Sequence, residues 1–150
     1  MRLARLWADE RGSAAIEFIT AGVVLLVPLV YLILTMAQVQ AGAFAVEGAS
    51  RQAARVFVRS DTLADADANA QRAIEFALAD YGFEPSAAKI TVACEPRPST
   101  CLTRRGFVTV TVELAIPLPL LPPMLSVGTP LSVPVSSPAT QQVSRFWIEG

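Results

Sequence analysis

The main hydrophobic feature of the chain is a long uncharged stretch near its N-terminus. No charged residue occurs between Phe18 and Val46, and the part from Phe18 to Ala37 is apolar almost throughout. As an α-helix of about 20 residues this part would be about 30 Å long, which matches the hydrocarbon thickness of a bilayer. The pattern therefore predicts a helix that spans a membrane once.

A cleavable secretory signal is the alternative explanation of this stretch. Arg2 and Arg5 form a basic start, and small residues that suit a signal peptidase occur at Ala41–Ala45. The apolar run is, however, longer than the roughly 7–15 residues usual in such signals. A retained anchor is the favoured interpretation.

The sequence predicts two helices, one that contains the apolar span and a second one whose apolar positions recur with helical spacing. The first is expected to run from Ser13 to Val58, as a transmembrane part followed by a stalk. The second is expected from Thr62 to Tyr81, with Asp61 as its N-cap and Gly82 just past its end. Its Asp65, Asp67 and Asp80 do not follow a known metal-loop spacing and are expected on a solvated face.

Alternating valine and threonine predict a β-hairpin after the second helix. Its strands are expected near Lys89–Cys94 and Gly106–Ile116. The following segment, Pro117–Pro138, is too rich in proline for a central strand. We expect an extended loop through Met124, then an edge strand near Pro130–Val135. The fold class is thus α+β: a long N-terminal transmembrane helix with its stalk, a second helix, and a small antiparallel sheet. Phe146 and Trp147 are expected to fold back on this domain.

Two rows of side chains recur every four positions in the stalk. One consists of alanines, with Gly42 and Gly48 beside it, and suits close helix packing in lipid or in a bundle; simple helix propensity explains it equally well. The other row consists of one glutamate followed by three arginines. It is either a solvated face or a strip that contacts anionic lipid or a partner. The rows are Ala37, Ala41, Ala45, Ala49 and Ala53, and Glu47, Arg51, Arg55 and Arg59.

Composition excludes several classes of function. The chain is 53% hydrophobic and only 17% charged, with a net charge of −1 and no histidine. Nucleic acid is not expected as a partner, because phosphate binding needs clustered Lys and Arg. Catalysis by Ser-His-Asp or Cys-His groups and histidine-ligated metals are excluded, and two cysteines cannot form an all-cysteine zinc site. We expect no enzyme activity, no metal, no cofactor and no small-molecule substrate.

The two cysteines bear on the compartment of the domain. Arginines lie on both sides of the span, so charge does not fix its orientation. Cys94 and Cys101 bracket a short turn between the two predicted strands, where a disulfide is geometrically natural. Such a pair indicates an oxidising compartment, so the C-terminal domain is expected outside the cytoplasm. Two unrelated buried thiols are the alternative.

The residues just before the span form a distinctive junction. The sequence runs from Arg11 and Gly12 through Ser13 to Glu17 and Phe18, where the apolar stretch begins. A cut after Gly12 would give Ser13 a free ammonium and would place Glu17 in the first turn of the helix. A carboxylate there is favoured by the helix dipole and could pair with the ammonium of a neighbouring subunit. An ordinary interfacial carboxylate is the alternative.

This junction resembles the class IV prepilin cleavage motif. The short charged leader, the Glu followed by an aromatic residue, and the long helix with a sizeable external part resemble the TadE-like pseudopilins of the tight-adherence (Tad/Flp) pilus system. The resemblance covers about the first 60 residues and implies cleavage between Gly12 and Ser13 by a prepilin peptidase. It also implies that Glu17 and Phe18 serve subunit registration during assembly.

The resemblance implies a layout and a set of partners. Residues 1–12 would be the leader, 13–58 the transmembrane and stalk helix, and 59–150 a small extracytoplasmic α+β domain. The expected partners are the prepilin peptidase, other pilins or pseudopilins, the Tad inner-membrane machinery and the lipid bilayer. The protein would cross the cytoplasmic membrane once with its N-terminus in the cytoplasm. The alternative is a membrane-anchored or secreted binding domain unrelated to pili.

Overall fold

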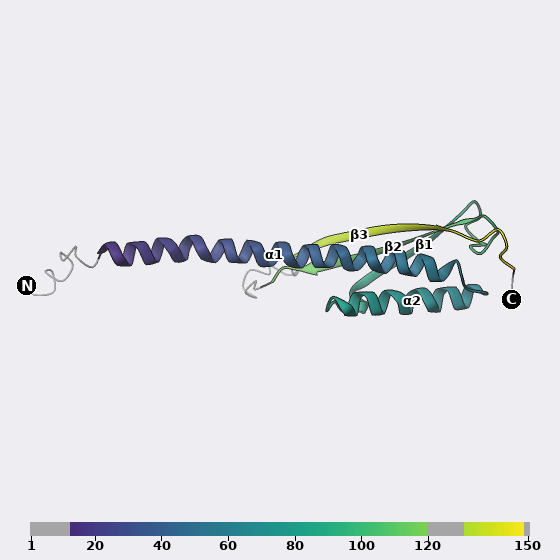
Figure 1. The fold of residues 1–150 in the computed structure, drawn as a ribbon, viewed down its shortest axis with the longest axis horizontal. Helices are drawn as coiled ribbons and strands as arrows, with labels where there is room; N and C mark the ends of the chain where they lie inside the picture. Colours follow the sequence, from purple (N-terminus) through teal and green to yellow (C-terminus); the bar gives the residue numbers. More distant parts are fainter. Residues whose placement is uncertain (1–12, 120–130, 149–150) are drawn as a thin grey trace, which may run out of the picture. The chain divides into compact units, whose positions relative to one another are not determined.

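A computed structural model describes residues 13–119 and 131–148 of the chain. It divides into two compact units, Met1–Met36 and Ala37–Gly150; we call the second unit the C-terminal domain. The expected α+β class is confirmed, with helices and a small antiparallel sheet (Figure 1). The elements are α1 (Ser13–Phe57), α2 (Leu63–Asp80), a short 3-10 helix (Pro85–Ala87), β1 (Ala88–Glu95), β2 (Phe107–Pro117) and β3 (Ser132–Gln142).

The long first helix is confirmed and ends one residue before the expected position. It is continuous through Pro28. At its C-terminal end the amide of Arg59 donates to Val56 O at 3.2 Å and that of Ser60 to Phe57 O at 3.2 Å. These tighter bonds satisfy carbonyls that the ending helix leaves without partners, and they turn the chain toward α2.

The sheet has β2 at its centre, with β1 and β3 paired antiparallel to it on either side. β2 alternates strictly, so Val108, Val110, Val112 and Ile116 are fully buried on one face. The opposite face is polar: Lys89 of β1 pairs with Glu113 of β2 at 3.5 Å, and Thr109 and Thr140 share a hydrogen bond of 2.8 Å. A two-faced sheet of this kind needs a covering layer on its apolar side only.

The third strand is longer than the sequence predicts. The expected edge strand near Pro130–Val135 is β3, which extends to Gln142 and pairs along the whole of β2. The prediction stopped short because of Pro134 and Pro138. These prolines are four residues apart, so both ring nitrogens point to the same side of the strand, and on an edge strand that side can be the unpaired one. Most of the loop expected through Met124 falls outside the described residues.

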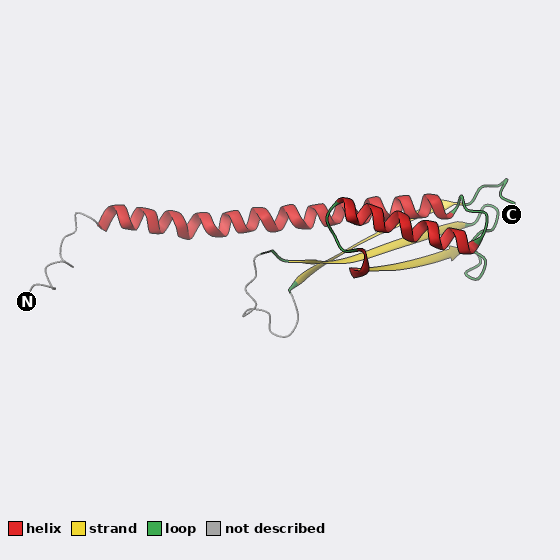
Figure 2. Ribbon diagram, turned by 90° about the horizontal axis from the view of Figure 1, so that it is seen from below, coloured by secondary structure: helices red, strands yellow, loops and turns green. Residues whose placement is uncertain are grey.

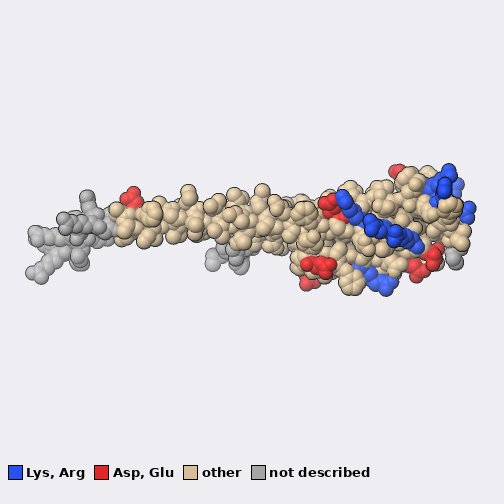
Figure 3. All heavy atoms as spheres, viewed as in Figure 1, with Lys and Arg blue, Asp and Glu red and all other residues tan. Residues whose placement is uncertain are grey.

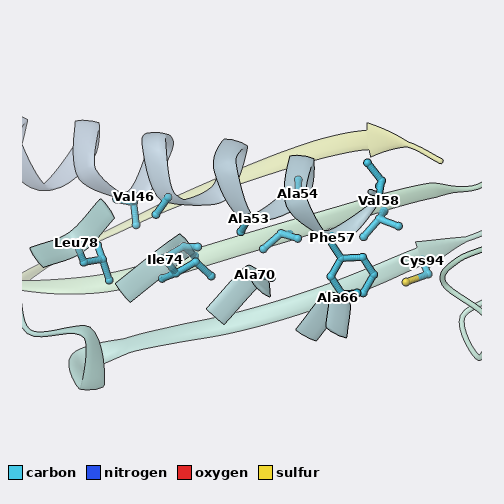
Figure 4. Close-up of a cluster of buried hydrophobic side chains, with 14 of the residues drawn as sticks. Val46, Ala53, Ala54, Phe57, Val58, Ala66, Ala70, Ile74, Leu78 and Cys94 are labelled. Atoms are coloured by element: carbon cyan, nitrogen blue, oxygen red, sulfur yellow. The ribbon is translucent and has the colours of Figure 1, made fainter. Parts of the chain in front are cut away.

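Both helices cover the apolar face of the sheet within the C-terminal domain (Figure 2). They run side by side and meet the strands in one continuous core (Figure 4). α1 contributes mostly alanine, which brings it close to its neighbours, and α2 contributes larger side chains near its C-terminal end. The fully buried helix residues are Ala45, Val46, Ala49, Ser50, Ala53, Ala54, Phe57, Ala66, Ile74 and Leu78, each with at most 1% of its surface exposed.

The N-cap of α2 is Thr62, so the assignment of this role to Asp61 is wrong. The Thr62 hydroxyl accepts from the Asp65 amide at 3.1 Å and donates to the Asp65 carboxylate at 2.7 Å. The backbone of Thr62 is extended (φ −126°), as an N-cap requires. Threonine is also a favourable N-cap residue, and the helix begins at Leu63, one position later than a cap at Asp61 would place it.

The C-terminal end of α2 agrees with expectation. Gly82 lies just past the helix with φ +75°, a conformation that favours glycine. Its amide donates to Ala79 O at 2.9 Å, and the amide of Phe83 donates to Leu78 O at 3.0 Å. This pair of bonds is a Schellman motif, which closes the helix and directs the chain back toward β1.

Candidate functional site

The N-terminal part of α1 is apolar and has no partner within the described chain. Its most apolar stretch has a mean hydropathy of 2.5, and none of it is buried. Phe18 is 80% exposed, Leu25 74% and Ile16 68%. By length and composition, α1 is the one helix in the described part of the chain that could cross a membrane.

An exposed surface of this kind needs an apolar environment. Burial of one large aliphatic or aromatic side chain is worth about 1.5–3 kcal/mol relative to exposure to water. A helix that is hydrophobic on all sides is therefore typical of a membrane segment or of a helix enclosed by other helices. The C-terminal part of α1, by contrast, is buried in the core of the C-terminal domain. Only the N-terminal part of the helix therefore needs an apolar environment from outside the described chain.

The residues of the expected processing and registration site are only partly described. Gly12 lies outside the described residues, and Ser13 is the first residue of α1. Glu17 and Phe18 are both exposed on the helix. The expectation that Glu17 lies in the first turn is wrong, because that turn contains no acidic residue. As the fifth residue of α1 it opens the second turn, where the helix dipole is already weaker.

The alanine row of α1 has an explanation within the chain. Ala45, Ala49 and Ala53 are fully buried against the rest of the C-terminal domain. Gly42 belongs to the same close packing: a Cβ atom there would lie 2.0 Å from Cδ1 of Ile116. Small residues thus bring α1 close to its own sheet along this part of the row, rather than to a second membrane helix.

The arginine row of α1 forms an exposed ridge along the C-terminal domain (Figure 3). Arg51, Arg55 and Arg59 are all exposed. Arg51 pairs with Glu47 one turn earlier, as the spacing suggests. The exposure agrees with a solvated face, and contact with a partner or with anionic lipid stays a prediction.

Cys94 and Cys101 form a disulfide, as expected, and the alternative of two unrelated thiols is wrong. Their Cα atoms are 5.0 Å apart. Cys94 is the penultimate residue of β1 and is buried in the core. The bond therefore fixes the loop between β1 and β2 to the folded sheet.

A pocket that the sequence did not predict lies at the end of the C-terminal domain where α1 ends. Its volume is about 830 Å³. Trp147 folds back into its wall, as expected, whereas Phe146 is 74% exposed and lies against Arg145. The lining comes from three separate segments, residues 61–63, 96–104 and 147–148, and no local pattern links them. The one local feature of the sequence at this site is the β1–β2 loop, which contains several arginine and threonine residues.

The described residues contain no group of three or more carboxylate, cysteine or histidine side chains placed to hold a metal ion. Comparison of the chain with protein families, with characterised proteins and with solved structures gives no match.

Proposed function

We propose that this chain is a membrane-anchored minor pseudopilin of a tight-adherence (Flp-type) pilus system. One observation carries the proposal: an unburied apolar helix follows Gly12 directly and continues into a small disulfide-bonded α+β domain. A pilin-like subunit needs both parts, since the apolar helix holds it in the membrane and then among other subunits. The domain remains in the aqueous phase.

The orientation follows from the disulfide. A structural disulfide is stable in an oxidising compartment and rare in the cytoplasm. The bond between Cys94 and Cys101 therefore supports an extracytoplasmic C-terminal domain, with the leader, residues 1–12, in the cytoplasm. The prepilin peptidase would cut between Gly12 and Ser13 at the cytoplasmic side of the membrane.

The packing of α1 argues against a cleaved secretory signal. Cleavage after Ala43 or Ala45 would cut a continuous helix inside the core. It would separate Gly42 from the domain, although Gly42 packs directly on Ile116. Cleavage after Ala45 would also remove a fully buried residue. Removal of this segment would therefore weaken the core, and retention of the apolar part is the simpler account.

In this proposal Glu17 and Phe18 serve assembly. Cleavage after Gly12 gives Ser13 an ammonium, and Glu17 is an exposed carboxylate one turn along the same helix. Opposite charges near the membrane surface favour one register when two such helices dock side by side. The partners would be other pilins or pseudopilins and the Tad inner-membrane machinery.

The variant Gly12→Glu tests the proposal. We expect it to block maturation and leave membrane insertion intact, because the scissile bond needs a small residue while the apolar span that drives insertion begins six residues later. The measurement compares chain length and membrane content in cells with the peptidase. Ala4→Glu, which adds the same charge within the leader, is the matched control. Normal processing of Gly12→Glu would contradict the proposal.

A further inference from the structure

The pocket at the end of the C-terminal domain combines cationic and apolar groups. Its lining comes from the α1–α2 turn, the β1–β2 loop and the segment after β3. These three segments lie at the same end of the domain in Figure 1. Its volume of about 830 Å³ falls in the range of about 300–1,000 Å³ that is typical of ligand sites. The lining includes Asp61, Leu63, Arg97, Arg104, Trp147 and Ile148.

The cationic part comes from Arg97 and Arg104. Neither forms an ion pair with another residue in the described ranges. Arg104 donates from Nε to Trp147 O at 2.8 Å, which holds its side chain at the wall and leaves its two terminal nitrogens for a ligand. Asp61 supplies one carboxylate, so the lining has a net positive charge.

The apolar part is centred on Trp147. The ring nitrogen donates to Ser60 O at 3.0 Å, and the backbone amide donates to Ser144 O at 3.1 Å. These bonds fix the indole as a wall of the pocket. Leu63 is 44% exposed and Ile148 69% exposed beside it. A ligand that bears both a negative charge and an apolar group would satisfy both kinds of wall.

We propose that this pocket binds an acidic peptide segment, with an apolar side chain next to its carboxylates, from a partner protein. A free phosphate would leave the apolar wall and most of the volume unused. Arginine pairs with carboxylates in a planar, two-bond geometry, and aromatic and arginine side chains are enriched where proteins bind one another. Basic side chains also gather at the end of the domain that carries the β1–β2 loop, and acidic side chains lie at the lower edge of the same end (Figure 3).

The proposal concerns the C-terminal domain alone and does not depend on the assignment to pili. Its test uses the full chain in detergent micelles with Trp7→Phe, which leaves Trp147 as the sole tryptophan and therefore as the reporter of the pocket. The probes are capped tetrapeptides that alternate Asp or Glu with Leu or Phe. We expect a saturable change in Trp147 fluorescence, and binding at least about tenfold weaker for the matched Asn and Gln peptides.

Arg97→Gln should weaken binding of the acidic peptides about tenfold or more. Arg55→Gln removes an exposed arginine outside the pocket and should leave the affinity unchanged. Equal thermal unfolding of both variants would show that the fold is intact. Arg104→Lys, tested in a chain that keeps Arg97, retains the charge but changes the donor geometry and should also weaken binding.

The proposal is overturned if no acidic peptide in the set binds, if the neutral peptides bind equally well, or if Arg97→Gln has no effect. Competition by inorganic phosphate or by phosphatidylglycerol vesicles at the peptide's own concentration would also overturn it, in favour of a simple anion or lipid site.

Discussion

At the scale of single residues, two glycines of α1 show why the same residue type can have opposite roles. Gly42 faces Ile116, whose side chain is fully buried and cannot move aside freely. Gly48 lies in the same helix, but a Cβ atom there would meet nothing within 4 Å. Glycine in a helix interior costs roughly 0.5–1 kcal/mol relative to alanine. Only at Gly42 does the close packing explain that cost.

We therefore expect Gly42→Ala and Gly48→Ala to change stability in opposite directions. Gly42→Ala should lower the free energy of unfolding by about 1–3 kcal/mol, because the added methyl group overpacks the contact with Ile116. Gly48→Ala should raise it by up to about 1 kcal/mol. Denaturant unfolding of the full chain with Trp7→Phe in micelles, followed by Trp147 fluorescence, measures both. Equal effects of the two variants would contradict the described packing.

At the scale of elements, the α2 cap corrects the sequence-based expectation in a way that can be measured. Thr62→Ala should destabilise the domain by about 1 kcal/mol, because it removes the acceptor of the Asp65 amide. Asp61→Ala should change stability by no more than about 0.5 kcal/mol, as for other exposed surface positions. Thermal unfolding of the two variants side by side distinguishes them, and a larger loss for Asp61→Ala would show that the cap is misassigned.

The disulfide ties the β1–β2 loop to the sheet. On the chain-entropy estimate, closing a loop of this length stabilises the fold by about 2.5 kcal/mol, and Pro96 and Pro98 reduce the gain because they already stiffen the unfolded loop. Replacing both Cys94 and Cys101 by alanine should lower stability by up to that amount. In the natively exported protein, alkylation without reductant should label neither thiol. Quantitative labelling of both would count against the bond and the extracytoplasmic placement.

How far the sequence predicted these elements depends on how local each signal is. The long apolar run and the 3.6- and two-residue periods are local signals, so they predicted α1, α2 and the hairpin to within a residue or two. The length of β3 was missed because a proline disrupts a strand only where the missing amide would bond to a neighbouring strand. Which side of a strand is paired cannot be read from the local sequence. The pocket around Trp147 was missed for the same reason. Its walls meet only after the α1–α2 turn, the β1–β2 loop and the C-terminal segment have been brought together by the fold.

At the scale of the whole molecule, the chain combines an apolar segment that has no partner in the described residues with a domain that has its own core. In the proposed function, the carboxylate of Glu17 sets the register in which the apolar segments of two subunits dock. Glu17→Gln keeps the size and helix propensity of the side chain but removes its charge. It should impair pilus formation while cleavage after Gly12 and membrane content stay near wild type. Wild-type levels of pili in cells that carry only this variant would rule out a registration role.

The most direct measurement for the proposed function is the N-terminal sequence of the mature protein. The chain would be purified from membranes of cells with and without a prepilin peptidase and its terminus determined by mass spectrometry. We predict Ser13 as the first residue when the peptidase is present, and the uncleaved chain starting at Met1 when it is absent. A terminus at Phe44 or Val46 would indicate a secreted domain, and Met1 under both conditions would indicate an uncleaved anchor. Either result would contradict the account.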